Sequence, residues 1–130
     1  MGYSIPAALG AKISDRDKQV IAVCGDGSFQ MSMCELATYK QENVPCKVVV
    51  FKNNYLGMVR EYQHFTYKDN YSVVELNDYP NLERLAGAYD MNYIKVSVNS
   101  DIDDAVDKFL KDDSSCIMEC LIDPMDIVRG

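Results

Sequence analysis

The feature that most constrains the fold is a strand–helix–strand pattern between residues 20 and 59. Two apolar, β-branched runs, Val20–Val23 and Val48–Phe51, predict buried parallel strands. Between them, Ser32–Glu42 has few helix-breaking residues and a helical pattern. A strand, a helix and a strand within about thirty residues predict a right-handed βαβ unit. In such a unit the loops after both strands open on the same edge of the sheet, where ligands bind.

The two loops at that edge carry an unusual set of polar groups. Gly25–Ser28 follows the first strand, and its glycines and the adjacent helix start favour close approach of an anion such as phosphate. Asp26 would repel a phosphate, so a bridging cation is the simplest explanation of its position. Asn53–Gly57 follows the second strand and adds amide and backbone carbonyl oxygens. Carboxylate, amide, carbonyl and phosphate oxygens together suit Mg²⁺.

Each loop by itself has an ordinary structural interpretation. A Gly-Asp-Gly sequence is a common turn, and Asn-Asn is a common loop signal. Their combination at the ends of consecutive strands is more specific, with Asp26 and Asn53 separated by 53 − 26 = 27 positions. Other phosphate-binding signatures fit less well, because the chain has no GxxxxGK[ST] loop and GDGSFQ does not match GxGxxG.

The spacing of these two loops resembles the signature of thiamine diphosphate enzymes, in which GDG is followed after about twenty-five to thirty residues by one or two asparagines, consistent with a phosphate and Mg²⁺ site. The strings MGYSIPAALGAK, GDGSFQMSMCELAT and NNYLGMVREYQ resemble the C-terminal cofactor domain of the acetolactate (acetohydroxyacid) synthase large subunit. The resemblance covers nearly the whole chain and is strongest from Met1 to Gln63.

The resemblance implies roles for individual residues. Asp26, Asn53 and the Tyr55 carbonyl would hold Mg²⁺, whereas Gly27 and Ser28 would hold the diphosphate. The bulky residue before the first glycine, Met1, would wedge between the two cofactor rings and set their V shape; the alternative is an uninformative start methionine. Ser28 could equally cap the helix, and Met58 and Val59 could be core residues. The complete expected cofactor-binding set is Met1, Gly25, Asp26, Gly27, Ser28, Asn53, Tyr55, Leu56, Gly57, Met58 and Val59.

One position is a candidate for substrate selection. GMVREYQ resembles GMVxxWQ of biosynthetic acetohydroxyacid synthases, in which the tryptophan lies by the substrate and favours 2-ketobutyrate as acceptor. Tyr62 occupies that position and shares a helix face with Val59. The resemblance therefore implies a weaker preference for 2-ketobutyrate than in relatives with tryptophan. The alternative is that Tyr62 packs without touching substrate.

The remaining sequence predicts a doubly wound, three-layer α/β domain with a mostly parallel sheet, the thiamine diphosphate-binding fold. Glu119 is unusual inside its apolar strand, and we expect it to lie at a sheet edge or to have a partner. A long loop is expected over His64–Asp78. The other expected elements are a helix capped by Ser4, a partly helical Tyr55–Tyr67, a helix at Asn81–Tyr89, a strand at Asn92–Val98, a helix capped by Ser100 and a strand at Ser115–Ile122.

Composition restricts the class of protein. The 130 residues suffice for a single domain, 1–130, and the net charge of −7 argues against nucleic acid or a membrane surface as partner. No apolar run is long enough to span a membrane, and no signal peptide is recognisable. The odd number of cysteines and the absence of CxxC pairs favour free thiols, most of them buried, in a reducing cytoplasm over disulfides or zinc.

The family motif begins at the first residue, so we expect a fragment of a larger multidomain enzyme. The resemblance implies that the full-length enzyme decarboxylates pyruvate and joins the product to a second 2-keto acid, forms a homo-oligomer and could have a regulatory subunit. The activating glutamate would come from a missing domain, so the fragment alone is expected to be inactive; flavin (FAD), if used, would also lie elsewhere. Alternatives are a pyruvate oxidase, another 2-keto acid decarboxylase, or a non-catalytic metal- and phosphate-binding module.

Overall fold

A parallel β-sheet lies at the centre of residues 1–126, the part of the chain that the computed structural model describes. Within these residues the strand order is β1-β2-β4-β3, and every neighbouring pair is parallel. The register places Gly25 beside Phe51 and Phe51 beside Cys120, so three strands end at one edge. The strands are β1 (Ile21–Gly25), β2 (Lys47–Lys52), β3 (Asn92–Val96) and β4 (Cys116–Leu121).

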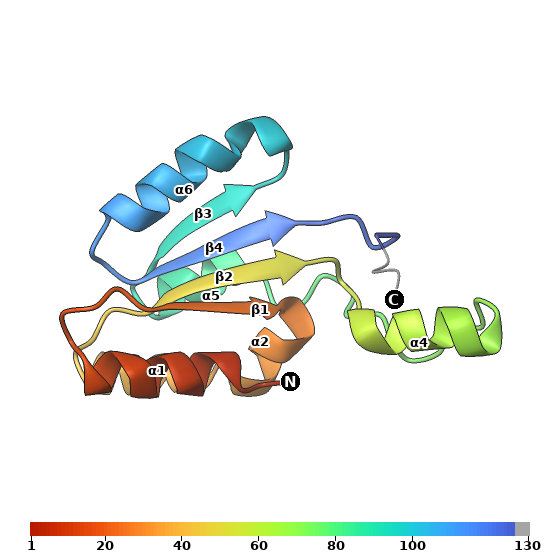
Figure 1. Cartoon of the computed structure of the whole chain (residues 1–130), viewed down its shortest axis with the longest axis horizontal. Coiled ribbons are helices and arrows are strands. Elements are labelled where there is room, and N and C mark those ends of the chain that lie inside the picture. Colours follow the sequence, from red (N-terminus) through yellow and green to blue (C-terminus); the bar gives the residue numbers. More distant parts are fainter. Residues whose placement is uncertain (127–130) are drawn as a thin grey trace.

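Helices cover the two faces of this sheet unequally. Side chains of α1, α2, α3 and α5 pack into one core on one face, and α6 packs into a second core on the opposite face (Figure 1). The helix α4 projects beyond the carboxyl ends of the strands (Figure 1). The described helices are α1 (Ser4–Ser14), α2 (Asp26–Ser32), α3 (Glu35–Gln41), α4 (Gly57–Tyr67), α5 (Leu82–Ala88) and α6 (Ile102–Lys111), with a 3-10 turn at Asn99–Asp101. The expected three-layer α/β architecture is therefore confirmed.

The alternation of side chains along β2 supplies both cores. Val48 and Val50 point into the core under α1 to α3 and α5, whereas Val49 points into the core under α6. Phe29 and Phe109 are the largest fully buried side chains of the two cores. Full burial of such a side chain stabilises the fold by about 1.5–3 kcal/mol. Burial on both faces explains why β2 reads as a continuous apolar run.

The connection between β1 and β2 differs from the prediction. Instead of one helix over Ser32–Glu42, the chain forms α2 and α3, separated at Met33 and Cys34. Helix α2 begins at Asp26, so the expected loop Gly25–Ser28 contains the first helical turn. The apolar pattern after Ser32 predicted only α3. Glycine is unfavourable inside a helix and common in turns, so the glycine at position 27 favoured a turn where α2 begins.

Two expected helix caps are wrong, and the position of Glu119 is resolved. Ser4 lies inside α1, and the residue before α6 is Asp101 rather than Ser100; neither helix has a side-chain cap. Glu119 lies on β4, which is flanked by β2 and β3 within the described sheet, so it is not at an edge. It has a partner instead: its carboxylate lies 3.2 Å from the Lys52 ammonium.

The β1 edge of the sheet is only half covered. Ala22 and Cys24 are buried, but Ile21 and Val23 point to the other face, where Val23 is 52% exposed. Phe51 on β2 is exposed on the same side. The prediction that Val20–Val23 is buried therefore holds for one face of the strand, because α6 covers only the β3 and β4 side of the opposite face.

The remaining expectations are met in part. Residues 64–67 extend α4, so the expected loop begins only at Lys68, and it contains a buried residue, Val74. All five cysteines are free: Cys24, Cys46 and Cys116 are buried, Cys34 is exposed and Cys120 is intermediate. Within residues 1–126, no helix combines the length and apolar character needed to cross a bilayer.

Candidate functional site

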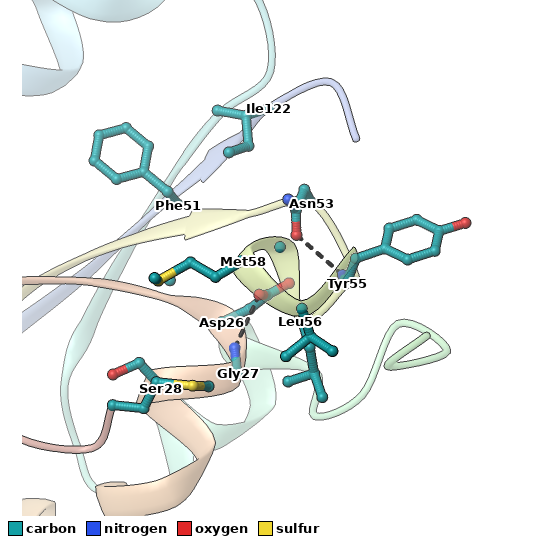
Figure 2. A pocket seen from close by; sticks show the side chains of 13 residues that line it. Asp26, Gly27, Ser28, Phe51, Asn53, Tyr55, Leu56, Met58 and Ile122 are labelled. Atoms are coloured by element: carbon teal, nitrogen blue, oxygen red, sulfur yellow. Dashed lines mark hydrogen bonds between the residues drawn. The ribbon is translucent and has the colours of Figure 1, made fainter. Parts of the chain in front are cut away.

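A cavity of about 220 Å³ lies at the carboxyl ends of β1, β2 and β4. It is formed by the start of α2, the loop after β2, the start of α4 and the residue that follows β4 (Figure 2). All eleven residues expected to bind cofactor line it. Its lining is Met1, Gly25, Asp26, Gly27, Ser28, Phe51, Asn53, Tyr55, Leu56, Gly57, Met58, Val59 and Ile122.

Asp26 joins the two loops through its carboxylate. One carboxylate oxygen accepts a hydrogen bond from the Gly27 N–H at 2.9 Å, and the other accepts from the Asn54 N–H at 2.7 Å. The side chain is 6% exposed. Burial raises the pKa of Asp26 above its ordinary value, although the backbone donors, chiefly Asn54, partly offset the effect. A cation at this carboxylate would relieve the cost of burying its charge.

The loop after β2 presents a second oxygen-bearing side chain, Asn53, to the same cavity. Asn53 Oδ1 accepts a hydrogen bond from the Tyr55 N–H at 3.0 Å (Figure 2). Tyr55 pairs with Glu75 in an antiparallel bridge, and flanking backbone bonds of 2.8 Å on each side tie the loop to residues 74–76. In such a pair the bridged residue's own N–H and C=O point away from the partner segment. The Tyr55 carbonyl therefore opens on the side of the Asn53 side chain.

These groups fit a hard divalent cation. Asp26 supplies a carboxylate, Asn53 an amide oxygen and Tyr55 a backbone carbonyl, and each of these oxygens keeps a lone pair beyond its present hydrogen bonds. Mg²⁺ uses one or two carboxylates together with phosphate and water oxygens. Among residues 1–126 no group of three or more His, Cys, Asp or Glu side chains converges, so the candidate ligand set contains a single carboxylate.

Close packing at the starts of α2 and α4 explains two of the glycines. A Cβ on Gly27 would lie 2.7 Å from Leu56 Cδ2, which is closer than real Cβ contacts. A Cβ on Gly57 would lie 3.3 Å from the Asn53 side-chain nitrogen. Because Leu56 and Asn53 both line the cavity, added methyl groups at these positions would displace lining side chains. The glycines thus set the shape of the cavity in addition to leaving backbone accessible.

Ser28 is engaged by the N-terminal segment. Its Oγ accepts a hydrogen bond from the Gly2 N–H at 2.8 Å. The hydroxyl hydrogen remains available for a ligand oxygen, because a serine hydroxyl both donates and accepts. This bond also holds Met1 beside the cavity, where its Cε lies 3.7 Å from the Cβ position of Gly27.

The rim of the cavity is strongly apolar. Met1, Met58 and Val59 line it, and Met58 is 79% exposed. The interpretation of Met58 as a core residue is therefore wrong in this chain. Large exposed apolar side chains beside a polar floor are typical of binding surfaces.

Tyr62 is not brought into this cavity. It lies one turn further along α4, is 60% exposed and packs edge-to-face on Tyr67. Two lining residues were missed: Phe51, which ends the apolar run of β2, and Ile122, which follows β4. The signal that could have found them is topological, since the ends of adjacent parallel strands share one edge of the sheet.

A polar network with buried Lys52 and Glu119 at its centre adjoins the loop after β2. The Lys52 ammonium contacts Asp78 at 2.5 Å and Glu119 at 3.2 Å, and the Tyr93 hydroxyl donates to Glu119. Burial lowers the pKa of Lys52, but its bonds to Asp78 and Glu119 outweigh this effect and leave the pKa raised. Lys52 therefore stays charged and also acts against the burial-induced rise in the pKa of Asp26.

Comparison with known proteins identifies relatives of this chain. Residues 1–120 match the family model "Thiamine pyrophosphate enzyme, C-terminal TPP binding domain". The chain is 34% identical over 128 residues to acetolactate synthase isozyme 2 large subunit of Escherichia coli K12, covering 98% of this chain and 23% of that protein. It is 43% identical over 97 residues to acetolactate synthase of Arthrospira platensis, covering 74% of this chain and 17% of that protein.

A solved structure shares the fold. The thiamine diphosphate-dependent 4-hydroxybenzoylformate decarboxylase of Rhodococcus jostii RHA1 superposes with a TM-score of 0.83 at 24% identity, covering 95% of this chain and 23% of that chain. The acetolactate synthase large subunit of Lactococcus lactis is 38% identical over 122 residues, which are 94% of this chain and 21% of that protein. The chain thus spans about a fifth of the length of the relatives it matches.

Proposed function

The chain belongs to the family of C-terminal TPP-binding domains of thiamine pyrophosphate enzymes, and from this premise we propose that it holds the diphosphate and Mg²⁺ of thiamine diphosphate (thiamine pyrophosphate) in an acetolactate synthase. The observation that carries the proposal is the double hydrogen bond of Asp26. Its carboxylate binds backbone N–H groups of both loops, so a carboxylate, an amide and a carbonyl oxygen lie around one cavity.

Each residue has a defined task in this proposal. Asp26, Asn53 and the Tyr55 carbonyl would hold Mg²⁺, which would neutralise charge on the diphosphate. Gly27 presents its backbone at the start of α2, and the Ser28 hydroxyl donates to a phosphate oxygen. Met1, Leu56 and Met58 exclude water from the apolar part of the cofactor. When bound, thiamine diphosphate supplies an electron sink for the bond cleaved at a 2-keto acid, and these residues fix its position.

The cavity accommodates only part of such a cofactor. Its volume of about 220 Å³ is below the range of about 300–1,000 Å³ usual for small-molecule sites. Exposed Met1 and Met58 border it and offer apolar surface for other parts of the enzyme. This supports the proposal that the chain is one domain of a larger enzyme and that the remaining contacts to the cofactor come from elsewhere.

For the full-length enzyme we propose acetolactate formation from 2-keto acids in branched-chain amino acid biosynthesis. Homo-oligomerisation and a cytoplasmic location belong to the same proposal, the latter supported by five free cysteines. A regulatory subunit and a flavin bound by another domain fit the same scheme. We further propose that Tyr62 meets the acceptor substrate only when other domains close over α4.

Calorimetric titration tests the domain's role directly. The chain is titrated with thiamine diphosphate and, separately, with ATP, each with and without Mg²⁺. We expect Mg²⁺-dependent binding of thiamine diphosphate, its loss in Asp26→Ala, and no comparable binding of ATP. Equal binding of both ligands would favour a general phosphate-binding module, and binding unaffected by Asp26→Ala would refute the metal assignment.

Product analysis of the full-length enzyme tests the reaction. Incubation with pyruvate should yield acetolactate, whereas acetaldehyde or acetyl phosphate as the main product would replace the synthase with a decarboxylase or an oxidase. The isolated 130-residue chain should form no acetolactate, because its cavity of about 220 Å³ accommodates only part of the cofactor.

A further inference from the structure

Helix α4 buries a charged side chain and exposes apolar ones. Within α4, whose residues are all described, Arg60 is the only buried side chain, at 7% exposed. Apolar residues of the same helix face outward, among them Met58 and Phe65. A charged guanidinium taken out of water loses hydration energy, so its burial requires specific partners in the fold.

The partners of Arg60 come from three separate segments of the chain. Its guanidinium lies over the Tyr55 ring at 5.0 Å and over the Tyr71 ring at 4.5 Å from the centroids. It also donates to the Pro124 carbonyl at 2.6 Å and to the Met125 sulfur at 3.0 Å. Arg60 thus links α4 to the loop after β2, to the loop after α4 and to the segment after β4.

The contact with Tyr55 reaches the metal site. The Tyr55 ring points away from Asp26 and from the cavity (Figure 2), toward the guanidinium over it. The backbone of the same residue donates to Asn53 and presents the carbonyl proposed as a Mg²⁺ ligand. Because the ring and the backbone of Tyr55 share one Cα, a ring held in this stack limits how far the backbone that carries the carbonyl and donates to Asn53 can shift. Arg60 therefore restrains ligand geometry without contacting the ion.

A further contact stiffens the other side of the stack. The Tyr71 hydroxyl donates to Asp69 at 2.6 Å, and His64 contacts the same Asp69 oxygen at 2.5 Å. Since His64 lies on α4, the Tyr71 ring is held against the helix that carries Arg60. The guanidinium is thereby fixed between two rings, one of which belongs to the metal-binding loop.

We propose that Arg60 is a positioning residue for the metal site, acting through the Tyr55 ring that it covers. The proposal rests on the function proposed above, because it requires the Tyr55 carbonyl to be a ligand. Neighbours that orient a metal ligand typically change metal affinity by about 10- to 100-fold when they are removed.

The test measures Mn²⁺ binding to the chain by the loss of the free-ion electron paramagnetic resonance signal. Mn²⁺ binding that is lost in Asp26→Ala is assigned to the proposed site, and Mn²⁺ binding that remains in Asp26→Ala is assigned to surface acidic groups. Arg60→Met, which keeps length but removes the charge and the planar donor group, should weaken the Asp26-dependent binding about 10- to 100-fold. Arg60→Lys should recover part of it, because the charge over the ring returns without the planar stack. Arg84→Met, at an exposed position of α5, is the matched control and should leave it unchanged.

A double-mutant cycle separates positioning from general stability. If Arg60 acts through the Tyr55 ring, Arg60→Met should have no further effect on Mn²⁺ affinity in a Tyr55→Ala background. Far-UV circular dichroism must show each variant folded at the temperature used. If the losses of Mn²⁺ affinity in Arg60→Met and Tyr55→Ala add, or if Arg60→Met leaves the Mn²⁺ affinity unchanged, the inference about Arg60 is overturned but the proposed function is not. Absence of any Asp26-dependent site in the unsubstituted chain would overturn the proposed function together with this inference.

Discussion

Gly27→Ala tests how the structure uses its glycines. The new Cβ would lie 2.7 Å from Leu56 Cδ2, whereas Leu76 and Met1, at 3.6 and 3.7 Å, make ordinary contacts. Overpacking of this kind costs about 1–3 kcal/mol. Gly27 is not among the residues with positive φ and lies inside α2, so alanine should return about 1 kcal/mol of helix propensity. The expected net loss of folding stability is about 1 kcal/mol.

The decisive measurement is the same substitution after Leu56 has been shortened. In a Leu56→Ala background the clash disappears and the helix propensity remains, so Gly27→Ala should then stabilise by about 0.5–1 kcal/mol. Gly10→Ala and Gly87→Ala are the controls, since nothing lies within 4 Å of a Cβ at either position. Both should stabilise by a similar amount.

The assay is urea unfolding followed by far-UV circular dichroism. The reversal of sign between the two backgrounds corresponds to a coupling energy of about 1–3 kcal/mol, well above the error of such measurements. An identical effect of Gly27→Ala with and without Leu56 would refute the reasoning. If the double variant regains stability but still fails to bind thiamine diphosphate with Mg²⁺, the backbone at Gly27 has a separate role at the diphosphate.

Three further predictions concern charge and substrate. The carboxyl ¹³C signal of Asp26 should titrate above the ordinary aspartate range in the metal-free chain and move to lower pH with Mg²⁺ and thiamine diphosphate. Because the folded-state pKa of Asp26 is raised, the folding stability that Asp26 contributes is present below its unfolded-state pKa and is lost as pH rises through its folded-state pKa. The exposed Asp78, whose pKa is lowered by its bond to Lys52, should titrate below the ordinary aspartate range. Lys52→Met should cost about 3–5 kcal/mol in urea unfolding, because it leaves the Glu119 carboxylate buried without its cation, and Glu119→Gln in the same chain should restore most of that loss. In the full-length enzyme, Tyr62→Trp should raise the share of product made from 2-ketobutyrate in competition with pyruvate, and an unchanged ratio would remove Tyr62 from the substrate site.

The sequence was most informative where side chains alternate between two cores. Val48–Phe51 could be recognised as a central strand because both of its faces are buried, and the three-layer architecture followed from it. Val20–Val23 carries the same pattern but lies at the uncovered edge, so the pattern cannot show which face will be packed. The identity of the strand was predictable, whereas its environment depends on the path of α6.

The site was predictable to the extent that it depends on strand ends. Asp26 and Asn53 follow consecutive parallel strands, so their proximity could be inferred from connectivity alone. Ile122 could not, because it requires the pairing of β2 with β4, strands far apart in the sequence. The burial of Arg60 was likewise hidden, since a single arginine in an amphipathic helix reads as surface, and only the positions of Tyr55 and Tyr71 reveal its packing.

The most direct test of the central claim is a crystal structure of the chain grown with Mn²⁺ and thiamine diphosphate, with anomalous diffraction used to locate the ion. The account predicts one Mn²⁺ within about 2–2.5 Å of the Asp26 carboxylate, the Asn53 amide oxygen and the Tyr55 carbonyl, with diphosphate oxygens completing its shell. An ion bound elsewhere, or a diphosphate bound in this cavity without a metal at Asp26, would contradict it.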